Sequence, residues 1–447
     1  MSRPVPEPLS ARRRPGSTGW VLMAGAGIAV AWATFRLVAA VAGGHPVLWA
    51  YLGGIGLLVW QLVSAAVDRP YRATPAAAAE LARAKVVVLV PAYNEDDAIL
   101  EASLRSLLRQ THLPAAVSVV DDGSTTGEYA GVRDRFLAHA RAAGVQVSWQ
   151  RTANGGKRHA QVSAARAFPD AELYLTIDSD TQLDARAIEE VLQPLADPQV
   201  QSVAGTILVT NYRTNLLTRM QEVWFVSMQF VDRAALSRMG SVLVNSGPLA
   251  VYRAAVLWDN VEDYLGETLF GRPVHTSDDS LLTLYAQQRG RTVHQTSAFA
   301  FSHMPTTFDG HRRQQLRWMR GSFMRSRTRF ARLPLSRFSF WIHLVRWMQY
   351  AAVTAALAVV IASGALLRPS AIVTCVVIVG AAQLLVAAPY LSLRRSDQTT
   401  AQRLVVVAVA PLVGLWSLTV LRVLRWYAMA TVGNVSWGTR KTIEVTA

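Results

Sequence analysis

Residues 85–97 read Lys-Val-Val-Val-Leu-Val-Pro-Ala-Tyr-Asn-Glu-Asp-Asp, an apolar run that ends abruptly in polar residues. Its centre, Val86–Val90, has the length and composition of a strand that is buried on both faces. A stretch with helical periodicity follows at 97–109, and a second apolar run follows at Val117–Val120. Strand, helix and strand in this order predict a βαβ unit with parallel strands.

The same alternation continues along the chain. Further apolar runs at Val145–Trp149 and Leu173–Ile177 predict two more buried strands. Helical periodicity separates or follows these strands at 128–142, 157–167 and 184–194. We therefore expect a doubly wound α/β domain over residues 85–307, with its ligand crevice at the carboxyl ends of the strands.

Acidic residues follow the first two predicted strands directly. The first strand ends in Tyr93, Asn94 and Glu95, and the second ends in Asp121 and Asp122. Carboxylates at this edge can accept hydrogen bonds from a ribose or a base, and Tyr93 offers a ring face. Each acidic group alone could equally be a helix N-cap. Their repetition at one edge of one sheet favours a nucleoside site.

Two further segments suit the charged part of a nucleotide. Asn154–His159 places two glycines before Lys157 at a predicted helix start, a composition that favours phosphate binding although it is not a Walker loop. Asp178 and Asp180 follow the strand Leu173–Ile177, and carboxylates two residues apart on extended backbone point to the same side. We expect them to hold Mg²⁺ or Mn²⁺ together with a diphosphate.

An acidic pair later in the chain suits acid–base chemistry. Asp278 and Asp279 precede a predicted helix, where Ser277 or Asp278 could also act as the N-cap. The functional alternative makes Asp279 the base that takes a proton from an acceptor hydroxyl, ionised at an ordinary pKa of about 3.9. In Gln314–Trp318, a Gln-Gln-Leu-Arg-Trp run, Arg317 could hold phosphate oxygens. Trp318 could stack on a sugar or anchor the chain at a membrane interface.

Composition points to a membrane. The 447-residue chain is 51% hydrophobic and has a formal net charge of +15. Its arginines gather beside apolar runs, as at Arg12–Arg14 and Arg312–Arg337, which follows the positive-inside rule and favours anionic lipid headgroups. We therefore expect membrane lipids as partners and no nucleic acid. The single cysteine, Cys375, excludes a disulfide or a cysteine-based metal site within one chain.

Apolar runs long enough to cross a bilayer flank the α/β region. We expect a disordered basic N-terminus at 1–19 and two transmembrane helices within 20–67, from Trp20 to Val41 and from Pro46 to Val67. Residues 308–337 mix arginines with large apolar residues and predict amphipathic helices at the membrane interface.

Residues 338–432 predict two to three transmembrane or re-entrant helices, with spans at 340–364 and 371–393. The last run, Leu404–Val432, contains a proline and two arginines, so we expect it to be broken or partly interfacial. The tail 433–447 would then lie on the cytosolic side.

These motifs occur in the order found in the family 2 inverting glycosyltransferases, which the chain resembles over about residues 85–335. It is most similar to the processive membrane branch of hyaluronan, chitin and cellulose synthases, and within that branch to hyaluronan synthases. Beside the motifs above, the matching segments are Ser246–Arg253, Gly290–Val293 and the tail motif Trp437–Arg440.

The resemblance implies a GT-A-type doubly wound domain embedded between N- and C-terminal transmembrane helices, UDP-sugar donors and a growing polysaccharide acceptor. It also implies a role for each motif residue: donor binding by Tyr93, Glu95, Asp121, Lys157 and Asp178, metal binding by Asp180 and Asp178, catalysis by Asp279 with Asp278, acceptor and pyrophosphate contacts by Gln314, Arg317 and Trp318, and gating by Trp437 and Arg440. Closure of the tail over the nucleotide would exclude water.

The chain departs from the hyaluronan-synthase pattern beside the acidic pair. That pattern has glycine before the pair and arginine after it, and here Ser277 and Ser280 stand at these positions. Hyaluronan made from UDP-GlcNAc and UDP-GlcA at the plasma membrane, by a cytoplasmic catalytic domain of a multi-pass protein, is the expected product. A single-donor chitin- or cellulose-type synthase and a catalytically silent membrane homologue remain alternatives, and the oligomeric state stays open.

Overall fold

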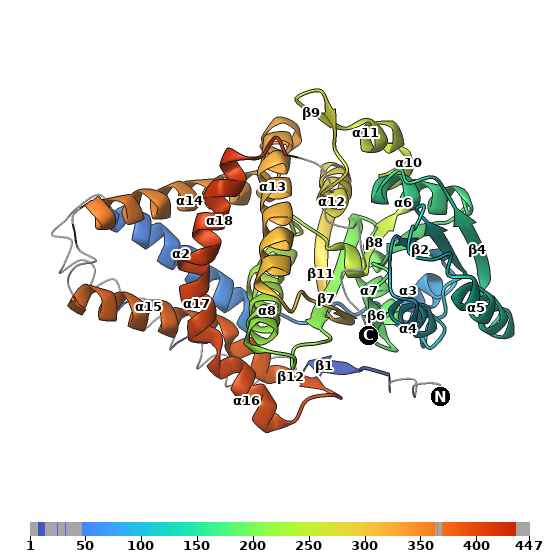
Figure 1. Cartoon of the computed structure of the whole chain (residues 1–447), viewed down its shortest axis with the longest axis horizontal. Helices are drawn as coiled ribbons and strands as arrows, with labels where there is room; N and C mark the ends of the chain where they lie inside the picture. The colour runs from blue at the N-terminus through green and yellow to red at the C-terminus, as the bar shows by residue number, and fades with distance from the viewer. Residues whose placement is uncertain are drawn as a thin grey trace.

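A computed structural model describes residues 8–13, 25, 32, 47–362, 364 and 369–434. Its centre is an eight-stranded sheet in the order β4-β3-β2-β5-β8-β7-β11-β6 (Figure 1). The strands are β2 (Val86–Ala92), β3 (Ala116–Asp121), β4 (Gln146–Arg151), β5 (Leu173–Thr176), β6 (Gln182–Leu183), β7 (Val200–Val209), β8 (Ala250–Arg253) and β11 (Arg291–Ser302).

The first half of the sheet confirms the predicted βαβ arrangement. Strands β4, β3, β2 and β5 are parallel neighbours. The predicted helices are also present, as α4 (Asp97–Leu107), α5 (Ala130–Ala142), α6 (Lys157–Arg166) and α7 (Ala187–Leu192). The second half is mixed, since β8 runs antiparallel to both β5 and β7, and β6 runs antiparallel to β11. The fold is therefore a mixed α/β sheet.

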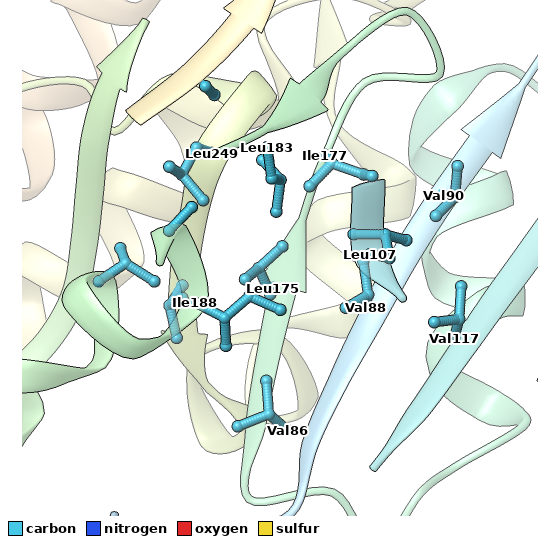
Figure 2. Close-up of a cluster of buried hydrophobic side chains, with 14 of the residues drawn as sticks. Val86, Val88, Val90, Leu107, Val117, Leu175, Ile177, Leu183, Ile188 and Leu249 are labelled. Atoms are coloured by element: carbon cyan, nitrogen blue, oxygen red, sulfur yellow. The ribbon is translucent and has the colours of Figure 1, made fainter. Parts of the chain in front are cut away.

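The strand β2 is buried on both faces. Val86, Val88 and Val90 pack with side chains such as Leu107 and Ile188 on one face (Figure 2). Val87 and Leu89 pack on the other face, with residues of α6 and of α12 (Asp278–Arg289). Each such valine contributes roughly 1.5–3 kcal/mol on burial. This explains why the strand reads as a continuous apolar run.

Shorter elements complete the domain and lead to its cleft. They are α3 (Pro75–Leu81), η1 (Gln193–Ala196), α8 (Leu216–Ser227), the π-helix η2 (Met228–Arg233), α9 (Ala234–Arg238), η3 (Gly247–Leu249), α10 (Ala254–Trp258), α11 (Val261–Gly266), β9 (Thr268–Leu269) and β10 (Arg272–Pro273). The long helix α13 (Phe308–Arg332) follows β11 and packs against α12 and α18 (Val420–Ala430).

Apolar helices extend from one side of this domain (Figure 1). They are α2 (Val47–Ala66), α14 (Phe338–Ala362), α15 (Pro369–Ala387), η5 (Ala388–Ser392), α16 (Thr400–Ala408), α17 (Ala410–Leu418) and α18. Within 404–432, which we expect to be broken or partly interfacial, the helix is interrupted locally at Val409 and at Thr419.

Two helical stretches in the described part of the chain are long and apolar enough to cross a membrane: Cys375–Ser392 and Thr400–Ala430. The predicted spans near 46–67 and 340–364 form helices α2 and α14, but neither is among these two stretches. In α2 only the shorter run Gly53–Ala66 is apolar in this sense. The predicted span 20–41 lies outside the described residues, apart from residues 25 and 32.

Disorder at the N-terminus was the wrong expectation for residues 8–13. Ala11–Arg13 form strand β1, which pairs antiparallel with β12 (Leu393–Arg395). The Ala11 N–H donates to Asp184 Oδ2 at 3.0 Å, and Arg13 pairs with Asp68 at 2.7 Å. Backbone pairing with a strand about 380 positions away orders a segment whose composition indicates disorder.

Helix α13 also differs from a simple amphipathic helix at a lipid surface. Its basic residues Arg325 and Arg329 are buried inside the protein. Arg325 pairs with Glu267, and Arg329 donates to the Leu243 carbonyl at 2.7 Å. Some of the positively charged side chains of this helix therefore pair with acceptors inside the protein and not with lipid headgroups.

Candidate active site

A cleft of about 1430 Å³ begins at the carboxyl ends of β2 and β5 and continues between α13, α14 and α18. Most of the predicted site residues line it: Tyr93, Glu95, Lys157, Asp178, Asp180, Asp278, Asp279, Gln314, Arg317 and Trp318. They are separated by up to 225 positions in sequence, and the structure brings them to one cavity.

Asp121 does not line this cleft, and its neighbour Asp122 does. Asp121 is buried, and its Oδ1 accepts a hydrogen bond from the Ser124 N–H at 2.9 Å. The Asp122 carboxylate accepts from the N–H groups of Gly155 and Gly156, at 2.9 and 2.8 Å. Burial raises the pKa of Asp122 from its ordinary value, against the effect of these two N–H donors. Asp122 therefore fixes the glycine turn before α6.

The end of β2 is tied to the segment that follows β5. Asp96, not Glu95, caps α4, and its side chain accepts from the Ala98 N–H at 2.9 Å. The carboxylate of Glu95 instead accepts a hydrogen bond from the Ser179 hydroxyl at 2.7 Å. Because Ser179 lies between Asp178 and Asp180, this hydrogen bond holds the predicted metal-binding segment next to Glu95 at the end of β2.

Lys157 sits among carboxylates at the start of α6. Its Nζ lies 2.6 Å from Asp178 Oδ1 and 3.1 Å from Asp278 Oδ2. Burial alone lowers the pKa of Lys157, but the two carboxylates outweigh it and the net shift is upward. A side chain on Gly247 would come within 3.1 Å of Nζ, so this glycine allows the close approach. Lys157 stays protonated and joins three segments of the site.

The acidic pair opens helix α12 from a strained turn. Ser277 has φ +64°, in the left-handed region that favours glycine, and its side chain does not cap the helix. Glycine, which adopts this conformation without strain, would suit this position better than serine. Gly321 of α13 packs here, since a Cβ on it would lie 2.7 Å from the Ser277 Oγ.

The two carboxylates of the pair have different surroundings. Asp278 is buried and contacts Lys157, which outweighs the effect of burial and lowers the pKa of Asp278. Asp279 faces the cleft, and burial, together with the charge of Asp278, raises its pKa to about 6. The expectation of an ordinary pKa near 3.9 was therefore wrong for Asp279. A carboxylate with this pKa is ionised at neutral pH and is a stronger base than an exposed one.

A triad of charged residues, Arg158, Glu267 and Arg325, holds the turn before the acidic pair. Glu267 accepts from Arg158 at 2.8 Å and from both terminal nitrogens of Arg325 at 2.5 and 2.8 Å. Arg158 also donates to the carbonyl of Thr276 at 2.6 Å, directly before Ser277. The triad thus links α6, the turn before α12 and α13. Sequence reasoning missed Glu267, and only the neighbouring Lys157-Arg158 motif pointed toward it.

The Gln-Gln-Leu-Arg-Trp run lies on the first half of α13. Gln314, Arg317 and Trp318 all face the cleft. The Trp318 ring packs edge-on against Phe225, with centroids 5.6 Å apart, and 36% of the residue remains exposed. This position suits contact with a sugar face. The predicted gating residues Trp437 and Arg440 lie outside the described residues.

The residues at the sheet edge fit a hard divalent cation. Asp178 and Asp180 supply two carboxylates to the same cleft wall. Over the described residues, no group of three or more histidine, cysteine, aspartate or glutamate side chains could hold a metal alone. Mg²⁺ is commonly bound by one or two carboxylates, with substrate phosphates and water as the other ligands. This donor set therefore fits a metal that arrives with a diphosphate.

Comparison with known proteins agrees with this chemistry. Residues 83–321 match the family described as "Glycosyltransferase like family 2". The chain is 33% identical over 365 residues to a hyaluronan synthase of Streptococcus pyogenes, covering 81% of this chain and 84% of that protein. It is 34% identical over 272 residues to an N-acetylglucosaminyltransferase of Rhizobium meliloti, covering 59% and 62%.

A solved structure shows the same fold. A mannosyltransferase from Pyrobaculum calidifontis, in complex with GDP-Man and Mn²⁺, aligns with a TM-score of 0.52 at 20% identity, over 88% of this chain and 99% of that one. At this identity the likeness supports the GT-A-like fold alone. With the family match and the long alignment to a hyaluronan synthase, the conclusion is that this chain belongs to the family 2 glycosyltransferases and is a UDP-sugar-dependent glycosyltransferase.

Proposed function

We propose that this protein polymerises UDP-GlcNAc and UDP-GlcA into a hyaluronan-like polysaccharide, with inversion at each transfer, and moves the polymer through its own membrane part. The observation that carries the proposal is the single cleft that joins Lys157, the acidic pair and the Arg317 helix to the apolar helices α14 and α18. The alignment to a hyaluronan synthase over 81% of the chain supports the choice of sugars.

The donor would bind at the sheet edge. Tyr93 and Glu95 would hold the uridine together with Asp121, whose buried carboxylate would be reached only after a local rearrangement. Lys157 would contact the diphosphate, and Asp178 and Asp180 would hold Mg²⁺ or Mn²⁺. A bound divalent cation supplies charge that stabilises the departing diphosphate.

The transfer itself would be a single displacement. Asp279 takes the proton of the acceptor hydroxyl, whose oxygen bonds to the anomeric carbon of the donor sugar as the carbon–phosphate oxygen bond breaks. The electron pair leaves on UDP, next to Arg317. Attack from the face opposite the leaving group inverts the anomeric centre and gives a β-linkage from an α-linked donor.

The acceptor polymer would then occupy the rest of the cleft. Gln314 and Trp318 border the catalytic end, and residues of α14 and α18 line the far end. We propose that these helices and the two membrane-length stretches Cys375–Ser392 and Thr400–Ala430 form the exit path, with the catalytic domain in the cytoplasm. The tail residues Trp437 and Arg440 would close over the nucleotide.

A single-donor synthase is the second candidate, and the N-acetylglucosaminyltransferase relatives favour it. Membranes that contain the full chain, incubated with labelled UDP-GlcNAc, UDP-GlcA or both, distinguish the two. The proposal expects polymer only with both donors, and expects a hyaluronan-specific lyase to digest it. Polymer from UDP-GlcNAc alone would establish the single-donor alternative.

A further inference from the structure

The far end of the cleft is strongly basic. Five arginine side chains from the four helices η2, α13, α14 and α18 line it: Arg233, Arg329, Arg346, Arg422 and Arg425. We refer to them as the arginine cluster. Among the described residues that line this end of the cleft, the only carboxylate is Asp232, which pairs with Arg346 and accepts from Gln61 at 2.7 Å. The remaining acidic residues of the cleft lie at the sheet edge.

The cluster is continuous and begins next to the acidic pair. Arg233 and Arg329 line the same cleft as Asp279, and Arg346 pairs with Asp232, the residue before Arg233. Further along, the guanidinium groups of Arg422 and Arg425 lie 5.4 and 5.9 Å from the Tyr350 ring centroid. A basic track therefore runs from the catalytic end toward α18.

Several polar atoms of this track are buried without a hydrogen-bond partner among the described residues. They are Arg233 Nη1, Arg329 Nε, Arg422 Nε, Arg422 Nη1 and the hydroxyl of Tyr350. Buried N–H groups in proteins are almost always paired, so these groups can donate hydrogen bonds to water or to a ligand that occupies the cleft.

At Arg329 the repulsion from neighbouring arginines outweighs the attraction of Asp279. Burial, and then the nearby charges of Arg325 and Arg346, lower the pKa of Arg329 to about 9. An anion in the cleft would relieve this repulsion and accept from the unpaired N–H groups. Planar guanidinium groups match a carboxylate in shape, and the stem and ring of Tyr350 provide an apolar contact for a sugar.

We propose that the arginine cluster is a subsite for the carboxylates of the growing polymer, so that the cleft selects an acceptor chain with uronic acid residues over a neutral one. This inference rests on the proposed function, since it assigns the far end of the same cleft to the acceptor. It names the chemical property by which the cleft distinguishes a hyaluronan-like chain from a chitin-like chain, which the motif residues at the sheet edge do not.

The test compares two probes of equal length on the full chain in detergent or nanodiscs. The first is an oligosaccharide of alternating N-acetylhexosamine and uronic acid, and the second is the same oligosaccharide after reduction of its carboxyl groups. Each charge-assisted contact changes affinity by about tenfold, so we expect the charged probe to bind at least about tenfold more tightly at low salt. Added salt should reduce the difference.

Variants locate the effect. Arg422→Gln with Arg425→Gln should remove most of the preference for the charged probe, and Arg422→Lys with Arg425→Lys should keep part of it because the charge remains. Arg403→Gln is the matched control, because Arg403 lies on helix α16, outside the cleft wall, and donates to the Leu391 carbonyl. It should bind both probes as the unchanged protein does. Thermal unfolding of each variant checks folding.

Equal binding of the two probes by the unchanged protein would overturn the inference, whatever the variants do. So would a preference that survives in the double glutamine variant. If phosphatidylglycerol in the nanodisc stabilises the unchanged protein but not the double variant, and both probes bind alike, the cluster binds lipid phosphate instead. UDP release from UDP-sugars, measured in parallel, tests the proposed function separately, because donor turnover without probe preference leaves that function standing.

Discussion

The two ends of the cleft have opposite charge and different construction. At the sheet edge, carboxylates from strand ends and helix starts surround Lys157. At the far end, arginines from η2, α13, α14 and α18 line the wall, those of α18 lie over the Tyr350 ring, and Asp232 is the one carboxylate among the described residues there. The first end suits cations and a metal-bound diphosphate, and the second suits an anionic chain.

This difference in charge would let one cavity bind the donor and the acceptor at separate places. A carboxylate-rich edge holds a metal–diphosphate and provides a base, but it repels a free anionic polymer. A guanidinium-rich end attracts that polymer and repels metal ions. Asp279 lies where the two ends meet, because its negative charge acts to raise the pKa of Lys157 at one end and of Arg233 and Arg329 at the other. Proton removal would thus occur at the boundary between the two fields.

The largest effect should come from removing the base at this boundary. Asp279→Asn keeps the size of the side chain and removes its ability to take a proton, so we expect UDP release to fall by about 10²–10⁴-fold. Steady-state UDP release with both donors measures it. Asp134→Asn, an exposed surface pair with Arg133, is the control and should leave the rate unchanged. An active Asp279→Asn protein would mean that the boundary is not the site of chemistry.

The buried triad behind the acidic end should give the next effect. Glu267→Gln leaves Arg158 and Arg325 without their shared carboxylate, and we expect a loss of about 3–5 kcal/mol in unfolding free energy. Denaturant unfolding measures this loss. Adding Arg325→Met should recover part of the stability, because it removes one unpaired charge. No recovery would show that Glu267 acts on the turn at Thr276 alone.

Metal removal separates the two ends directly. Chelation with EDTA should abolish UDP release, because the departing diphosphate needs the positive charge of the metal that Asp178 and Asp180 would hold. Mn²⁺ or Mg²⁺ should restore it. Binding of the charged oligosaccharide at the arginine cluster should persist in EDTA. Loss of both UDP release and oligosaccharide binding in EDTA would contradict the separation of the two ends.

The pH profile gives a smaller and more specific effect. The pKa of Asp279 is raised to about 6, so the base form is present above this pH and is lost as pH falls through it. With metal and donors saturating, kcat should fall about twofold at pH 6 relative to pH 8 and about tenfold further per unit below it. A profile that stays flat down to pH 5 would place Asp279 in an exposed, ordinary environment.

The smallest effect concerns the strained turn before the pair. Ser277→Gly relieves a left-handed backbone at φ +64°, so we expect about 1 kcal/mol of added stability. Gly321→Ala should destabilise, because its Cβ would lie 2.7 Å from the Ser277 hydroxyl. Thermal unfolding of the double variant tests the contact. The cost of Gly321→Ala should shrink in the Ser277→Gly background, and purely additive effects would exclude it.

The sequence indicated the sheet-edge end far better than the arginine end. Strand β2 and its polar end are one continuous stretch, so a local pattern determines both the burial of Val88 and the exposure of Tyr93 to the cleft. The motif residues mostly fall where strand ends meet, which is a property of parallel topology. Asp121 is the exception, since a one-residue difference decides that Asp122 faces the cleft instead.

The rest depended on tertiary contacts that no local pattern shows. The antiparallel insertion of β8 between β5 and β7, and the pairing of β1 with β12, join segments far apart in sequence. The arginines of α13 suggested a lipid-facing surface, because the sequence shows their charge but does not show which acceptors they contact. Glu267, the acceptor of Arg325, lies 58 positions away.

The most direct test of the central claim, that one cleft binds the nucleotide at its acidic end, is a cryo-electron microscopy map of the full chain with UDP and Mn²⁺. The account predicts density for the diphosphate and the metal between Lys157, Asp178 and Asp180, with Asp279 open to the cleft beyond them. Nucleotide density on another surface, or an empty cleft at saturating UDP and Mn²⁺, would contradict it.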